Sequence, residues 1–174
     1  MNKKLYLEAK KNPNLRQEFC DSIKLGKLGE YITHVIYNPQ PNEQEKEIVA
    51  STSFLFPGQK SKIICFPLIF EDKRISLDDP EGIILDHEGF HATDIYKSHP
   101  LVLNHIKAED SKKEDLKNYF YSLIEIRALT NQVINITKRN FSENYKTRLF
   151  KYMDYFTALN YSLSKKLKIK HQIK

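Results

Sequence analysis

The sequence predicts an α+β fold in which a small mixed sheet of about three strands is followed by a central helix and two further helices. Three segments among the first 66 residues are rich in strand-forming side chains: 30–37, 48–55 and 62–66. After them, apolar residues recur at helical spacing over residues 80–97 and in two later stretches. This order, strands first and helices afterwards, indicates an α+β architecture.

The chain is predicted to form one domain that spans residues 1–174. Its 174 residues, of which 40% are hydrophobic, are enough to bury one core. No repeat period or low-complexity tract divides the sequence, so nothing suggests a second domain.

Two features precede the central helix. A short helix is predicted to begin at Asn12-Pro13 and to end at Gly26, with these apolar residues along it: Leu15, Phe19 and Ile23. In the sheet, segment 62–66 is the candidate edge strand, where an extended polypeptide can pair through backbone hydrogen bonds. An ordinary core strand is an equally weighted interpretation of that segment.

The central helix is predicted over about residues 80–97. Asp79 suits the N-cap and Pro80 the first helical position. Apolar residues support the same span: Ile83, Ile84, Phe90 and Ile95. Pro100 closes the segment, and His99 is expected to act as a cation near the helix C-terminus.

This helix carries His87-Glu88-Gly89-Phe90-His91, a run with the spacing HExxH. Residues four apart on a helix share a face, so His87 and His91 can present two imidazole nitrogens to one cation. Zinc held by three protein ligands lowers the pKa of a bound water to about 7, and a neighbouring carboxylate can accept its proton. We therefore predict His87 and His91 as zinc ligands and Glu88 as the general base.

A third ligand is needed, and five downstream residues are candidates: His99, His105, Glu109, Glu114 and Glu125. Glu109 and Glu114 lie in the charged run 107–115, which is typical of a solvated loop and helix start. Glu125 is instead a lone acid within a largely apolar helical stretch, and a buried carboxylate needs a partner. Arg127 is a poor partner because residues two apart on a helix do not face each other. The third ligand is therefore predicted to be Glu125.

Two more residues are candidates for supporting roles. Asp94 shares a helix face with His87 and His91, and metal-bound histidines usually donate their second N–H to a carboxylate or carbonyl. An exposed helix acid is the alternative for Asp94. Tyr121, one turn before Glu125, is the candidate donor of a hydrogen bond to the oxyanion.

The HEGFH run, followed about 34 residues later by Glu125-Ile126-Arg127-Ala128, resembles the gluzincin class of zincin metallopeptidases. In that class HExxH and a glutamate on a later helix bind zinc. The resemblance covers residues 83–129 and singles out no particular family within the class. It implies a zincin-like fold, a Zn²⁺ cofactor, a peptide or protein substrate, the ligands His87, His91 and Glu125, and Glu88 as catalytic base. The sequence after His91 does not resemble that of a metzincin.

Two other interpretations stay open. His105 stands 14 residues after His91, a layout similar to that of SprT-like proteases, which act on DNA-associated proteins, but the expected His-Gly context is missing. In the other interpretation, zinc only ties two helices together in a noncatalytic module whose basic surface binds a partner. Glu88 discriminates against it, since closed structural zinc sites have no use for an unligated glutamate beside a ligand.

The last predicted helix has apolar residues at alternating spacings of four and three, which indicates core packing. They are Tyr145, Leu149, Tyr152, Phe156, Leu159 and Leu163.

The net charge of +6 comes from scattered lysines and from a lysine-rich tail after residue 164. No arginine-rich or aromatic recognition pattern accompanies it, so nucleic acid is not the expected partner. Cys20 and Cys65 are too few for a disulfide scaffold and are expected to be buried, reduced thiols. With no signal peptide and no membrane span in the sequence, a cytoplasmic location is expected.

Overall fold

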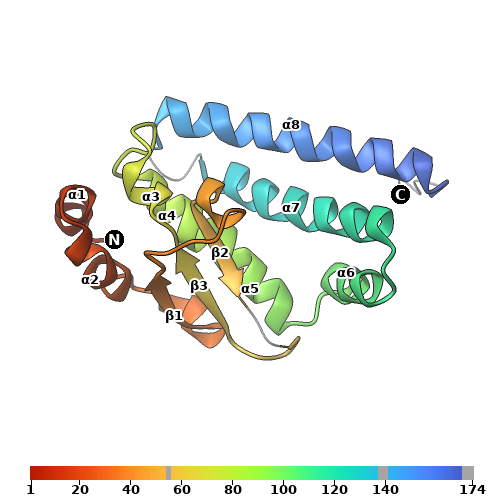
Figure 1. The fold of residues 1–174 in the computed structure, drawn as a ribbon, viewed down its shortest axis with the longest axis horizontal. Helices are drawn as coiled ribbons and strands as arrows, with labels where there is room; N and C mark the ends of the chain where they lie inside the picture. Colours follow the sequence, from red (N-terminus) through yellow and green to blue (C-terminus); the bar gives the residue numbers. More distant parts are fainter. Residues whose placement is uncertain (54–55, 137–140, 170–174) are drawn as a thin grey trace.

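The sheet lies at the centre of the fold, and helices pack on both sides of it (Figure 1). The computed structural model describes residues 1–53, 56–136 and 141–169. Residues 54–55 of the second predicted strand segment and the end of the lysine-rich tail lie outside these ranges. The strands are β1 (Ile32–Tyr37), β2 (Ala50–Ser53) and β3 (Ser61–Cys65). The helices are α1 (Lys3–Lys11), α2 (Arg16–Asp21), α3 (Leu68–Glu71), α4 (Asp79–Glu81), α5 (Gly89–Tyr96), α6 (Pro100–Asp110), α7 (Glu114–Ile136) and α8 (Glu143–Lys166), with the π-helical segment η4 (Gly82–Glu88) between α4 and α5.

The three strands have the order β1-β3-β2, which confirms the predicted small mixed sheet. β3 runs parallel to β1 and antiparallel to β2, and Ile63 of β3 is paired with Val35 on one side and Thr52 on the other. Of the two equally weighted interpretations of segment 62–66, the edge strand is therefore wrong and the core strand is confirmed. β2 and β3 are adjacent antiparallel strands, and β1 occupies the other side of β3, so β2 is left at the edge that faces η4.

The layers are arranged so that one helical segment separates the sheet from the long helices. α5 packs on β3, η4 packs on β2, and both also contact α7 (Figure 1). α2 packs on β1, and α8 lies alongside α7. The main core cluster joins α1, α2, the sheet, η4 and α8, with Phe19, Ile63 and Ile84 among its fully buried side chains.

The central helical segment runs from Asp79 to Tyr96, close to the predicted span of about 80–97. Asp79 is not its N-cap. The Asp79 carboxylate lies within the first turn and accepts hydrogen bonds from the backbone N–H of Ser76 and from the hydroxyl of Ser142 in the chain that leads into α8. The middle of the segment is π-helical, a local widening that is often found at functional sites.

Three helices follow the central segment, one more than predicted. The additional helix is α6, and Pro100, expected to close the previous helix, is its first residue. His99 is the N-cap of α6, where its Nδ1 accepts a hydrogen bond from the N–H of Leu101 at 3.2 Å. The expected role of His99 as a cation at the end of the central helix is therefore wrong.

The predicted apolar stripe of α8 is buried at its two ends but not in its middle. Tyr145, Leu149 and Leu163 are buried, whereas 57% of the surface of Tyr152 is exposed. Between those ends, Asn160 takes a buried position and donates hydrogen bonds to the hydroxyl of Ser122 and a backbone carbonyl of α7. The prediction of a continuous core stripe is thus wrong at Tyr152.

Cys20 and Cys65 are buried and free, as predicted. None of the described helices is long and apolar enough to cross a membrane.

Candidate metal site

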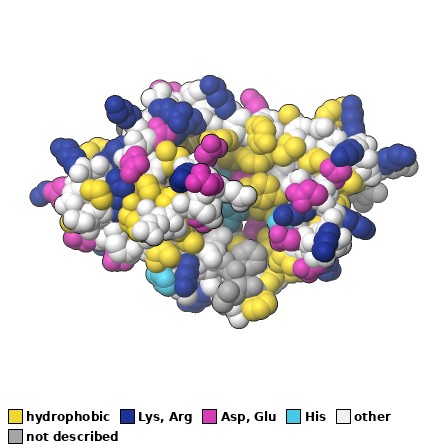
Figure 2. All heavy atoms as spheres, in the orientation of Figure 1, with side chains coloured by type: hydrophobic (Ala, Val, Ile, Leu, Met, Phe, Trp, Pro, Cys, Tyr) yellow, Lys and Arg dark blue, Asp and Glu magenta, His cyan; other side chains and the backbone are white. Residues whose placement is uncertain are grey.

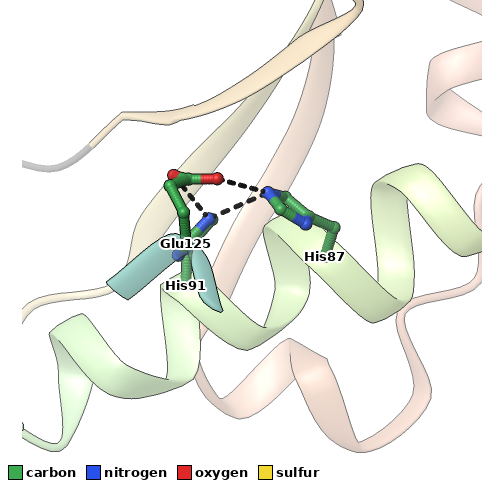
Figure 3. A group of neighbouring side chains, drawn as sticks. All are labelled: His87, His91 and Glu125. Carbon is green, nitrogen blue, oxygen red and sulfur yellow. Dashed lines mark hydrogen bonds and ion pairs between the residues drawn. The ribbon is translucent and has the colours of Figure 1, made fainter. Parts of the chain in front are cut away.

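His87, His91 and Glu125 converge on one point (Figure 3). The two Nε2 atoms of the histidines are 3.0 Å apart. Each carboxylate oxygen of Glu125 lies near one histidine: Oε2 is 3.3 Å from Nε2 of His87, and Oε1 is 3.3 Å from Nε2 of His91. One potential ligand atom from each of the three residues lies within 4.8 Å of the others.

The backbone brings the three residues together from two helices. His87 is near the end of η4 and His91 is in the first turn of α5, so both project from the central segment. Glu125 lies midway along α7, which packs on η4 and α5. His91 and Glu125 are each only 9% exposed, so water does not surround these polar groups.

The charges of these groups are strongly coupled. Burial disfavours the protonated form of His87, but the hydrogen bond and the negative charge of Glu125 outweigh it and raise the pKa of His87 to about 9. Burial would likewise raise the pKa of Glu125, but the two histidines hold it well below its usual range. The site therefore favours a positive charge beside the Glu125 carboxylate, carried by a proton when no metal is bound.

A glutamine orients His87. The Oε1 atom of Gln132 lies 2.9 Å from Nδ1 of His87, and its amide nitrogen donates to the hydroxyl of Tyr145 on α8 at 2.6 Å. Gly82 makes room for this arrangement, because a Cβ there would lie 2.6 Å from the Tyr145 hydroxyl. Sequence reasoning missed Gln132, although it stands seven residues after Glu125, on the same face of a helix.

Glu88 is 6% exposed and lies beside the histidines, since its charge also contributes to the raised pKa of His87. The hydroxyl of Thr52 on the edge strand β2 lies 2.7 Å from Oε2 of Glu88 and 2.9 Å from its backbone carbonyl oxygen. Thr52 thus fixes Glu88 against the sheet. No sequence signal pointed to Thr52, because the contact joins residues 36 positions apart.

The two residues predicted for supporting roles have different surroundings. Asp94 is 6% exposed, so it is not the exposed acid of the alternative interpretation, and both its oxygens accept hydrogen bonds from Arg127, at 3.0 and 3.2 Å. Within the described part of the chain, no hydrogen bond joins Asp94 to His87 or His91. Tyr121 stands one turn before Glu125 on α7, and partial burial together with the negative charge of that carboxylate raises the pKa of Tyr121.

The other candidate ligands lie outside the group. Glu109, at the end of α6, and Glu114, at the start of α7, are exposed. His105 lies on α6 with its Nδ1 3.2 Å from the backbone carbonyl oxygen of Lys117.

The site opens into a cleft of about 510 Å³. Figure 2 shows the hollow, with histidine side chains visible inside it and hydrophobic side chains along its rim. The floor carries His87, Glu88, His91 and Glu125, one wall is residues 47–52 leading into and along β2, and the opposite wall comes from α7 and α8. This volume is within the range of small-molecule and peptide sites.

Comparisons with protein-family models, with curated proteins and with solved structures gave no match.

Proposed function

We propose that this chain is a zinc-dependent metallopeptidase that hydrolyses peptide bonds, with His87, His91 and Glu125 as ligands and Glu88 as general base. One observation carries the proposal. Three side chains from two helices direct two imidazole nitrogens and a carboxylate at a common point on the floor of a large cleft.

The donor set suits zinc. Two histidines and one glutamate are a ligand set of catalytic zinc sites, which keep one position open, whereas structural sites are closed by four protein ligands. No fourth histidine, cysteine, aspartate or glutamate joins this group among the described residues. The hydrogen bond that Nδ1 of His87 donates to Oε1 of Gln132 is the kind of support that metal-bound histidines usually have.

When bound, zinc would supply Lewis acidity and lower the pKa of a water molecule. Glu88 would take the proton of that water and later pass it to the leaving amine. The hydroxyl of Thr52 donates a hydrogen bond to the Glu88 carboxylate and holds it in place. Tyr121 lines the cleft beside Glu125, and its predicted role as oxyanion donor is retained in the proposal.

The cleft offers a place for an extended substrate. The backbone carbonyl of Val49 faces β3, where it accepts from the N–H of Phe66 at 3.1 Å. Because hydrogen-bonding direction alternates along an antiparallel strand, the backbone groups of Ala50 and Thr52 face away from β3. In the described residues they have no backbone partner, so a peptide lying in the cleft can pair with them.

Zinc content tests the metal site. The measurement is zinc per chain by elemental mass spectrometry on native-purified protein, in parallel with Glu125→Ala and Glu109→Ala. About one zinc per chain is expected in the native protein and in Glu109→Ala, whose exposed side chain lies outside the group, and almost none in Glu125→Ala. Absence of zinc from all three, even after reconstitution, would contradict the proposal.

Hydrolysis tests the catalytic role. Zinc-loaded protein is incubated with a peptide library, and Glu88→Gln is compared at equal zinc content. A loss of about a hundredfold or more in kcat is expected from Glu88→Gln. Equal turnover by both proteins would show that Glu88 is not the base. A zinc-bound protein whose Glu88→Gln variant is as stable and that cleaves nothing would favour the noncatalytic module.

A further inference from the structure

The wall of the cleft opposite β2 contains aromatic side chains that the core does not fully cover. Tyr152 and Phe156 continue the apolar stripe of α8 that begins at the buried Leu149, and both line the cleft, Tyr152 exposed and Phe156 partly buried against the core. Tyr121 of α7 joins them, with its ring 5.9 Å from that of Phe156 in an edge-to-face arrangement. These three residues are here called the aromatic wall.

The aromatic wall adjoins the candidate metal site directly. Tyr121 stands one turn before Glu125 on α7, and both residues line the same cleft. Tyr121 is 43% exposed and Tyr152 57%. Large apolar surfaces left open beside a reactive centre favour a ligand that covers them.

The charges around the cleft favour an uncharged occupant. Asp72, at one end, is paired with Arg74 at 2.7 Å and with Arg148 at 3.5 Å. At the floor, Glu125 faces the two histidines and Glu88 is held by Thr52. Glu47, another acid that lines the cleft, is exposed on the wall formed by residues 47–52. A charged side chain against the aromatic wall would lose hydration beside rings that carry no opposite charge, which is costly.

We infer that Tyr121, Tyr152 and Phe156 form a subsite for one large, uncharged side chain of the substrate, aromatic or long aliphatic, next to the bond that is cleaved. This inference rests on the proposed function, because it assigns the polypeptide class that the same site takes. Aromatic side chains gain both from burial of their area and from edge-to-face contact with the wall.

Binding of a tryptophan peptide tests the subsite without requiring hydrolysis. The chain contains no tryptophan, so the emission of a blocked peptide with the sequence Ser-Gly-Ala-Trp-Ala-Gly-Ser reports on the peptide alone. Native protein and the slow-turnover Glu88→Gln variant are titrated with this probe. Competitor peptides carry phenylalanine, leucine, alanine or aspartate in place of the tryptophan.

Blue-shifted emission is expected on binding, with phenylalanine and leucine peptides competing and the alanine peptide binding about thirtyfold more weakly. Tyr152→Ala should weaken binding of the tryptophan peptide about tenfold and change the affinity of the alanine peptide less than about twofold. Phe150→Ala is the control, since this half-exposed side chain lies on the same helix but does not line the cleft.

Equal affinities for the tryptophan, alanine and aspartate peptides, no binding of any of them, or equal effects of Tyr152→Ala and Phe150→Ala would overturn the subsite. The outcome is separable from that of the proposed function. Hydrolysis without an apolar preference overturns the subsite and leaves the peptidase, whereas selective binding by a protein without zinc or hydrolysis leaves the subsite and overturns the peptidase.

Discussion

The same helical segment carries two buried polar clusters, and they differ in how their groups are satisfied. At its start, the fully buried Asp79 accepts hydrogen bonds from the N–H and hydroxyl of Ser76 and from the hydroxyl of Ser142, with Arg148 3.8 Å away. Further along, His87 and His91 crowd their nitrogens against each other and against the carboxylate of Glu125.

The difference separates a structural cluster from a ligand-binding one. Around Asp79, donors from the chain surround one acceptor, and the carboxylate is satisfied without a ligand. Around Glu125, two imidazoles and a carboxylate bring lone pairs to one point, and only a proton or a metal ion can reconcile them. Substitutions in one cluster can therefore be compared with substitutions in the other as the reference.

Zinc should stabilise the native chain through one cluster only. At a free zinc concentration of a thousand times Kd, the free energy of unfolding is expected to rise by about 4 kcal/mol. The rise should vanish in Glu125→Ala and persist in Asp79→Ala. Denaturant unfolding with and without zinc measures it, and an equal rise in Glu125→Ala would remove the distinction between the clusters.

Removal of the Asp79 carboxylate should lower the free energy of unfolding by about 3 kcal/mol, with or without zinc, because buried donors and the Arg148 guanidinium lose their partner. Asp78→Ala is the matched control. Its carboxylate pairs with Lys3 at the surface, so its removal should change the same quantity by less than about 1 kcal/mol. If both substitutions cost the same, the Asp79 cluster is not a structural anchor.

Gln132 contacts His87 of η4 and Tyr145 of α8 through its side chain. Its loss should weaken zinc binding without removing a ligand. Gln132→Leu is expected to raise the Kd for zinc by about 10- to 100-fold, because His87 loses the partner of its second nitrogen. Gln132→Glu keeps an acceptor at that position and should recover most of the affinity. Competition with a zinc chelator gives both values, and identical affinities for the two variants would show that Gln132 does not act through His87.

The pH dependence of the metal-free protein should also distinguish the clusters. In the folded chain the pKa of His87 is raised from 6.5 to about 9, so its contribution to stability is fully present below pH 6.5 and is lost as the pH rises through 9. We expect the free energy of unfolding to fall by up to about 3 kcal/mol over that window, in the native chain and in Asp79→Ala. Glu125→Gln removes the charge that raises the pKa and should abolish this fall. With zinc present the slope should reverse, because protons compete with the metal.

Local sequence determined the pieces that lie within one element. The HExxH spacing places His87, Glu88 and His91 on one helical segment, since a helix repeats every 3.6 residues whatever surrounds it. The three strand segments and the span of the central helix also follow from residue preferences and from Pro80 at the helix start. Glu125 could be predicted as a buried, partnered acid because a lone carboxylate in an apolar helix needs a partner.

Tertiary structure alone decided which elements meet. Arg127 pairs with Asp94 across helices, and Thr52 pairs with Glu88 across 36 residues. β2 is an edge strand because β3, paired on both sides, lies in the middle of the sheet. In the same way the middle of the α8 stripe faces a cleft, although its spacing is that of a core helix. Periodicity fixes the direction of a side chain relative to its own helix or strand, but the partner on the other side is set by how whole elements pack, a property that no local window of sequence contains.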